Sequence, residues 1–149
     1  MGLRYYESQA TGVVVAQLEA GDLLLECIRD LVKEADIHTG VLMTGIGSLS
    51  KARIHTVSTN VNPVEELYLD IDGPLEVTHF MGLIANYEPH IHISMCTPEM
   101  KFYGGHLEEG CQILTLSEIT LLRVPDLKLH RRPMPERSPY HYRMLDTQK

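Results

Sequence analysis

One stretch of this sequence has the period of an amphipathic helix, and most other apolar residues fall into short, strand-like runs. From Leu24 to Ala35 the apolar residues recur at helical spacing, so this segment is expected to lay one apolar stripe on a core. Asp22 is the expected N-cap, and the helix is expected to end near Asp36. One helix among many strands joined by short turns predicts an α+β domain with an antiparallel-dominated β-sheet.

The expected strands follow one another at short intervals. Turns are expected at Gly47-Ser48 and at Asn62-Pro63. The Gly-x-Gly of Gly45 and Gly47 lacks the third glycine and the helix start of a dinucleotide-binding fingerprint, so its expected role is a tight turn between two strands. The strands are placed at about residues 13–18, 40–46, 52–57, 65–71, 75–85, 90–96 and 112–124.

The chain has the size and composition of a single globular domain. It has 149 residues, of which 44% are hydrophobic and 22% are charged. We expect an N-terminal extension over residues 1–11, the folded domain over 12–124 and a basic, proline-rich C-terminal tail over 125–149. The prolines of this tail are incompatible with a long helix or a central strand.

Neither a secretory signal nor a membrane span is predicted. The first ten residues contain no apolar run, and no stretch approaches about 18 consecutive apolar residues. Three cysteines without a Cys-x-x-Cys pair favour reduced thiols over disulfides or a cysteine zinc site, so a soluble, cytoplasmic protein is expected. They are Cys27, Cys96 and Cys111.

Charge is distributed unevenly along the chain. Residues 1–123 carry 7 basic and 17 acidic side chains, a net charge of −10, whereas residues 124–149 carry 6 and 3, a net charge of +3. An acidic body repels phosphate backbones, and nucleic-acid-binding proteins usually present a basic face. DNA binding is therefore disfavoured for the body, and only the tail, with Arg131 and Arg132, has the charge to attract DNA.

Two histidines, His90 and His92, are separated by a single residue. In a strand, both imidazoles would project from one face, about 6–7 Å apart at Cα, and could reach one ion. The alternative is an ordinary half-buried strand whose alternating isoleucines face the core, because eight histidines in 149 residues make one such pair expected by chance.

A hairpin would add a third histidine to this pair. If residues 97–101 close it, Cys96 pairs with Phe102, and counting outward places His92 opposite His106, about 4.5–5.5 Å apart at Cα. A loop one residue longer or shorter would turn His106 to the other face. Three neutral imidazoles with an open fourth position are typical of a substrate-accessible zinc site, and nitrogen ligands suit Zn²⁺ and other late first-row divalent metals. The predicted metal ligands are therefore His90, His92 and His106.

Three further side chains are catalytic candidates beside such a metal, namely Arg53, Glu88 and Glu108. A carboxylate near a metal-bound water can accept its proton, so Glu108, or its neighbour Glu109, could be a general base, with Glu88 as the rival candidate. The alternative for the pair at 108 and 109 is an exposed acidic turn, which we favour.

The other histidines are assigned structural roles. His79 is expected on the strand over 75–85, on the same face as Val77 and Met81, as a packed and hydrogen-bonded core residue; metal ligation is the alternative. His38 and His55 stand alone among polar or turn residues and are expected to be solvated.

Four short segments stand out along the chain, namely Gly45-Ile46-Gly47-Ser48-Leu49, Gly73-Pro74-Leu75-Glu76-Val77, Glu88-Pro89-His90-Ile91-His92 and Gly104-Gly105-His106-Leu107. In this order, they resemble the successive motifs of the PPC ("plants and prokaryotes conserved") domain family. The resemblance covers roughly residues 12–124. It implies a mostly antiparallel α/β domain that assembles as a homotrimer and, in many prokaryotic members, a metal held by histidines that correspond to His90, His92 and His106.

The chain also departs from the plant members of that family. It lacks their AT-hook, a short Arg-Gly-Arg-Pro core, and so resembles a prokaryotic stand-alone member. In the plant Gly-Arg-Phe-Glu-Ile-Leu partner motif, Pro74 here replaces the arginine and Thr78 replaces the leucine, so partner binding of the plant kind is not expected. DNA association is thus implied by family resemblance alone.

The PPC fold is also similar to that of acetolactate decarboxylase, whose zinc is held by an HxH pair and a later histidine. Because of this similarity, an enzyme is the second class of function that we consider. The sequence therefore predicts a metal-binding PPC-domain protein, and the alternative is a metal-dependent enzyme of the lyase or hydrolase type that acts on a small oxygenated substrate at the metal. A plain oligomeric interaction module is the third class.

Overall fold

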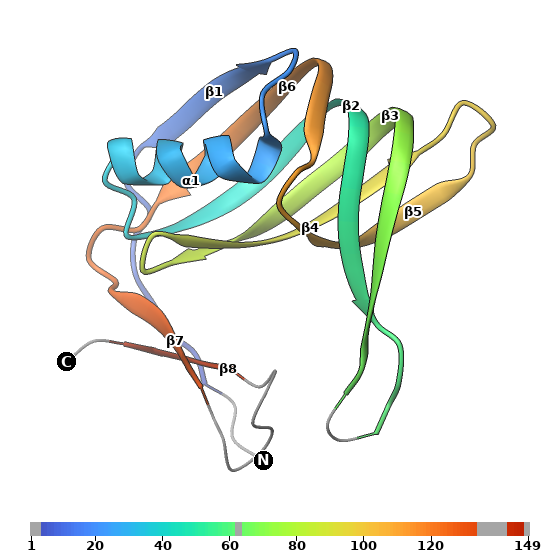
Figure 1. The fold of residues 1–149 in the computed structure, drawn as a ribbon. Helices are drawn as coiled ribbons and strands as arrows, with labels where there is room; N and C mark the ends of the chain where they lie inside the picture. The colour runs from blue at the N-terminus through green and yellow to red at the C-terminus, as the bar shows by residue number, and fades with distance from the viewer. Residues whose placement is uncertain (1–3, 62–63, 134–142, 148–149) are drawn as a thin grey trace.

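A computed structural model of the protein describes residues 4–61, 64–133 and 143–147. Its main sheet has six strands in the order β1-β6-β2-β3-β4-β5, and β7 pairs with β8 apart from it (Figure 1). The elements are β1 (Val13–Glu19), α1 (Leu24–Glu34), β2 (Thr39–Val57), β3 (Glu66–Ala85), β4 (Glu88–Cys96), β5 (Phe102–Leu107), β6 (Gln112–Arg123), β7 (Leu129–Pro133) and β8 (Arg143–Thr147).

Every strand pair of the main sheet is antiparallel. This confirms the predicted α+β class with one helix. The longest pair, β2 with β3, runs on beyond the sheet as a two-stranded arm (Figure 1). Near the start of that arm, β2 also pairs with β5, through Ile54↔Leu107 and His55↔His106. The sheet therefore curls until its last strand, β5, pairs with its third strand, β2. This pairing brings His55 next to His106.

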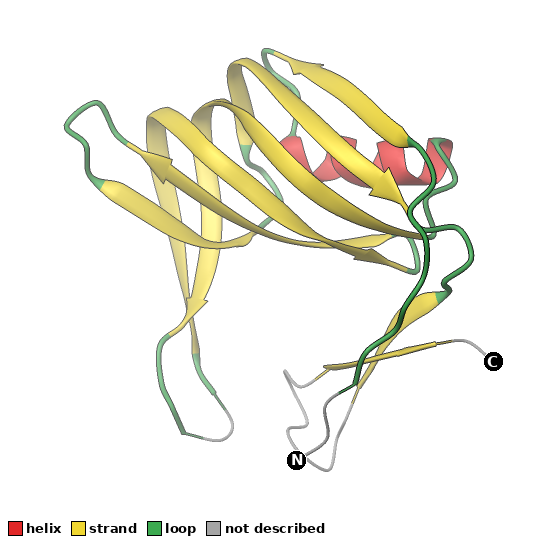
Figure 2. Ribbon diagram, turned by 180° about the vertical axis from the view of Figure 1, so that it is seen from behind, coloured by secondary structure: helices red, strands yellow, loops and turns green. Residues whose placement is uncertain are grey.

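The helix α1 covers one face of the sheet and lies behind the strands in Figure 2. Its buried residues Leu24, Ile28 and Val32 join a core cluster that includes Phe80 and Met95. The predicted N-cap is wrong, because the cap position is Leu23, while the carboxylate of Asp22 accepts a hydrogen bond from the backbone N–H of Glu19 at 2.8 Å. The start of the helix is held instead by the residue before β6, since Leu24 N donates a hydrogen bond to the Cys111 carbonyl at 2.8 Å.

The turn expected at Gly47-Ser48 is also wrong, since β2 runs without a break from Thr39 to Val57. A β-carbon on Gly45 would lie 2.0 Å from Cζ of the buried Phe80 ring. A β-carbon on Gly47 would lie 2.4 Å from the Leu116 carbonyl oxygen of the neighbouring strand, at a φ of +152°. These glycines therefore permit close packing within a continuous strand and do not reverse the chain.

The expected strands over 65–71 and 75–85 are likewise one strand, β3, which continues through Gly73-Pro74. The turn expected at Asn62-Pro63 lies outside the described residues. In the part of the tail that the structure describes, β7 and β8 form a small two-stranded sheet separate from the main one.

All three cysteines are free thiols, as expected. Cys96 and Cys111 are buried, and burial raises the pKa of Cys111 to about 11. In the described residues, no helix has the length and apolar character needed to cross a membrane.

Candidate metal centre

The β4–β5 hairpin has the predicted register. Cys96 pairs with Phe102 and His92 pairs with His106. The connecting loop is closed by backbone hydrogen bonds from Thr97 N to the Lys101 carbonyl at 3.0 Å and from Met100 N to the Thr97 carbonyl at 2.9 Å. Because this loop has the predicted five residues, His106 lies on the same face of the sheet as His92.

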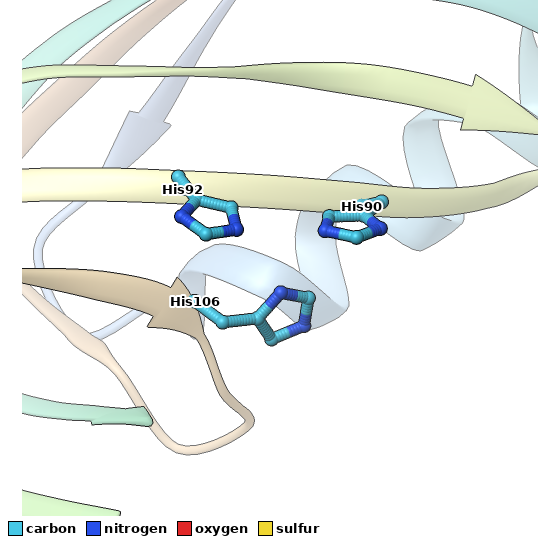
Figure 3. A group of neighbouring side chains, drawn as sticks. All are labelled: His90, His92 and His106. Carbon is cyan, nitrogen blue, oxygen red and sulfur yellow. The ribbon is translucent and has the colours of Figure 1, made fainter. Parts of the chain in front are cut away.

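Alternation along β4 separates the core from the site. Ile91 and Ile93 are buried in the core cluster, whereas His90 and His92 project from the opposite, exposed face. One ring nitrogen from each of His90, His92 and His106 can be chosen so that all three lie within 4.8 Å of one another. The ring centroids of His90 and His106 are 4.8 Å apart, and each of the other two pairs is 5.5 Å apart (Figure 3).

Burial favours the neutral imidazole at two of these residues, His90 and His106. Burial, followed by the neighbouring histidines, lowers the pKa of His106 to about 4. The pKa of His90 is also lowered, first by burial and then by the positive charge of Arg131. A neutral imidazole has a free nitrogen lone pair, which is the form that binds a metal. The three ring nitrogens that meet on this accessible face fit Zn²⁺ or another late first-row divalent ion.

A fourth histidine, His55, belongs to this cluster. The prediction that it is solvated is wrong, because the β2–β5 pairing places it directly opposite His106, with ring centroids 4.6 Å apart. Its Nδ1 donates a hydrogen bond to Glu108 Oε1 at 2.5 Å, and its Nε2 lies 3.8 Å from Glu66 Oε1. The pairing joins strands about fifty residues apart in sequence, so no local pattern could have indicated it.

Of the three catalytic candidates, Glu108 is the one that the structure brings into the cluster. Its carboxylate forms a second potential ligand group with His55 and His106, again with all ligand atoms within 4.8 Å. The exposed acidic turn that we favoured is therefore wrong for Glu108, which is half-buried. The prediction of an exposed acidic residue is correct for Glu109, which forms an ion pair with Arg29.

The other two candidates have partners of their own. The exposed carboxylate of Glu88 lies 2.9 Å from a guanidinium nitrogen of Arg29. Arg53 is exposed, 3.9 Å from the Asp70 carboxylate, with its guanidinium carbon 5.7 Å from the centre of the Tyr68 ring. Neither side chain belongs to the ligand groups around His106.

Two further histidines, His79 and His38, also differ from expectation. His79 is exposed and is not a core residue, because a register shift between Val77 and His79 leaves Val77 facing the core and His79 on the other face. Its Nδ1 is 3.3 Å from the Ser94 hydroxyl. His38 is half-buried, with its ring edge-on to Tyr87 at 5.1 Å, and is not fully solvated.

Several solved structures have the same fold. A protein from Salmonella enterica is 19% identical, with a TM-score of 0.82, and the match covers 97% of this chain and 98% of that one. A plant- and prokaryote-conserved protein from Pyrococcus horikoshii is 24% identical, with a TM-score of 0.75 and coverage of 89% and 92%. A protein from Archaeoglobus fulgidus described as metal-containing is 22% identical, with a TM-score of 0.72 and coverage of 82% and 86%.

The fold is also similar to that of an enzyme and of two proteins conjectured to bind DNA. Acetolactate decarboxylase from Bacillus subtilis is 10% identical, with a TM-score of 0.53 and coverage of 78% of this chain and 54% of the enzyme. The two conjectured DNA-binding proteins come from Bacteroides thetaiotaomicron and Ralstonia eutropha, with TM-scores of 0.77 and 0.72. At 15% and 22% identity, these two share the fold.

Among curated proteins, the chain is similar to bifunctional protein GlmU from two strains of Synechococcus. The identity is 25% and 26% over 119 residues, which is 80% of this chain but 18% of each relative. The chain therefore spans less than one fifth of the length of the curated relatives it matches. Residues 5–125 match the family described as the Plants and Prokaryotes Conserved (PCC) domain, the family written PPC above, and the chain belongs to that family.

Proposed function

We propose that this PPC-domain protein binds a transition metal, Zn²⁺ or another late first-row divalent ion, through His90, His92 and His106. The observation that carries the proposal is the convergence of three ring nitrogens within 4.8 Å, from two adjacent strands, on the face opposite the core. The low pKa of His106, about 4, supports it because this imidazole is free to donate its lone pair at neutral pH. Metal analysis of protein purified without added metal tests the proposal.

The position of Glu108 and His55 favours an enzymatic role as the second candidate. A metal at the histidines would supply a Lewis acid that polarises a carbonyl or acidifies a water. Glu108 is the nearby proton acceptor, and the hydrogen bond from His55 Nδ1 at 2.5 Å holds its carboxylate in place. A small oxygenated substrate fits a site on an accessible face of the sheet.

Glu108→Gln separates the two functions, because it keeps the shape of the side chain but removes the basic oxygen. Metal-loaded wild-type protein is assayed for turnover on a panel of small oxo acids and esters, and both proteins are analysed for metal. A metal-dependent enzyme would show turnover that falls by about 10²-fold or more in the variant at unchanged metal content. Lack of turnover on the panel by loaded wild-type protein would argue against this second candidate.

We also propose that the protein is a cytoplasmic homotrimer. Edge strand β1 exposes Val13 and Val15, which are 60% and 73% accessible, and a neighbouring subunit would cover such an edge. Further exposed apolar residues are Met43, Ile46, Met81, Phe102, Leu114 and Leu116. The expected mass in solution is about three times the chain mass of 16.8 kDa. Multi-angle light scattering at micromolar concentration measures it, and the mass of a single chain would contradict the trimer.

Duplex DNA is expected to bind weakly at physiological salt. A trimer would gather a charge of about −21 from three chains of −7 each, which opposes association with phosphate. The basic tail is partly neutralised, since Arg132 pairs with Asp146 at 2.9 Å. Fluorescence anisotropy with a labelled duplex measures the affinity, and residual binding through phosphate contacts of Arg131 and Arg132 should disappear on truncation after Val124. Sub-micromolar, sequence-selective binding by the truncated protein would contradict this prediction and favour a DNA-binding role.

A further inference from the structure

The C-terminal tail brings an arginine to the histidine cluster from outside the matched family domain. Arg131 lies on β7, six residues beyond the end of the family match at residue 125. Its Nη2 donates to the Leu83 carbonyl at 2.9 Å, and its Nη1 donates to the Glu88 carbonyl at 3.1 Å. Leu83 is the cross-strand partner of His90, and Glu88 precedes His90 by two residues. The guanidinium is therefore docked on the backbone beside His90, near the turn between β3 and β4. Figure 1 shows β7 next to this turn.

Among the described residues, this guanidinium forms no ion pair with a carboxylate; the charge of Glu88, whose carboxylate is paired with Arg29, acts on it from a longer distance. The arginine ion pairs found there join Arg29 to Glu88 and Glu109, Arg53 to Asp70, and Arg132 to Asp146. Arg131 instead donates to two neutral carbonyls and is half-buried. Since a guanidinium carries five N–H donors, donors remain for a further partner. A partly desolvated cation of this kind is well suited to an anion.

The two sides of the cluster differ in charge. Arg131 and Arg143 are the arginines whose positive charge acts on His90. The carboxylates of Glu66 and Glu108 lie on the other side, around His55. An anionic group that approaches the cluster is therefore attracted at the His90 side and repelled at the His55 side.

We propose that Arg131 binds the carboxylate of a small ligand whose other oxygens are held at the three histidines. This inference rests on the proposed metal site and names its ligand class, a small carboxylate that carries a second oxygen. Arginine is suited to the task because its planar fork matches a carboxylate with two parallel hydrogen bonds. The tail is then part of the binding site and sets its preference for anions over neutral analogues.

The test compares the binding of lactate with that of lactamide, its neutral amide, to Co²⁺-loaded protein. Titrations monitored by the visible absorption of the bound Co²⁺ give the affinity for each ligand. Arg131→Gln should weaken lactate binding by about tenfold or more while leaving lactamide binding unchanged, because only lactate presents a carboxylate. Arg132→Gln is the matched control: it removes the same charge from the next residue of β7, which pairs with Asp146. It should bind both ligands as the wild type does.

Arg131→Lys distinguishes a charge contact from a purely structural role, because both variants lose the two-carbonyl docking of the arginine but lysine keeps the charge. Lysine should retain more lactate affinity than glutamine. Equal lactate affinity in wild type and Arg131→Gln, equal loss for lactate and lactamide, or equal weakening by lysine and glutamine would each overturn the inference while leaving the metal proposal standing. Wild-type protein that takes up no Co²⁺ would overturn the metal proposal and this inference with it.

Discussion

Replacement of either His92 or His106 by alanine is expected to lower the metal content of the purified protein by about tenfold or more. Each substitution leaves two imidazoles, and a two-ligand remnant loses the chelate geometry of a three-nitrogen site. His106 is the more informative of the two, because it lies at the point where the two potential ligand groups meet. Inductively coupled plasma mass spectrometry after purification without added metal measures the content per chain.

His79→Ala is the matched control for this experiment. His79 is an exposed histidine on β3, outside both potential ligand groups, so its loss should leave the metal content unchanged. Circular dichroism should show the same fold in all variants, since the core is built from apolar residues on the other face of β4. Metal retained at wild-type stoichiometry in both His92→Ala and His106→Ala would refute the site.

Gly45→Ala is expected to destabilise the fold by about 3 kcal/mol, the upper end of the usual cost of overpacking a core. The added methyl group would lie 2.0–2.3 Å from three atoms of the Phe80 ring, and this ring is fully buried. It has little room to move away, because interiors are packed at crystal-like density. Urea denaturation followed by circular dichroism measures the free energy of unfolding. The exposed neighbouring substitution Thr44→Ala should change it by no more than about 0.5 kcal/mol.

A double-mutant cycle with Phe80→Leu identifies the clash as the cause. Leucine removes the ring atoms that the new methyl group would meet, so the double variant should be more stable than the sum of the two single effects predicts. The expected coupling is about 1 kcal/mol or more in the favourable direction. Additive effects would mean that Gly45 is required for a reason other than the ring.

The register of the β4–β5 hairpin shows which features of the fold can be predicted from local sequence. The spacing between His92 and His106, with a five-residue loop, was enough to predict that these two residues pair. Both strands are adjacent in the chain, and the two-residue period of a strand then decides which side chains share a face. The glycines at 45 and 47 were misassigned because a turn and a close interstrand contact both require the absence of a side chain, and composition does not distinguish them.

The sequence by itself determined the α+β class, the single helix, the hairpin and the three clustered histidines, because each depends on residues close together in the chain. Tertiary structure alone decided that His55 and Glu108 join this cluster, since the sheet had to curl until β2 met β5. It also decided that Arg131 of the tail docks beside His90. Such contacts join segments forty or more residues apart, and their free energy comes from the packing of the whole sheet and not from any local pattern.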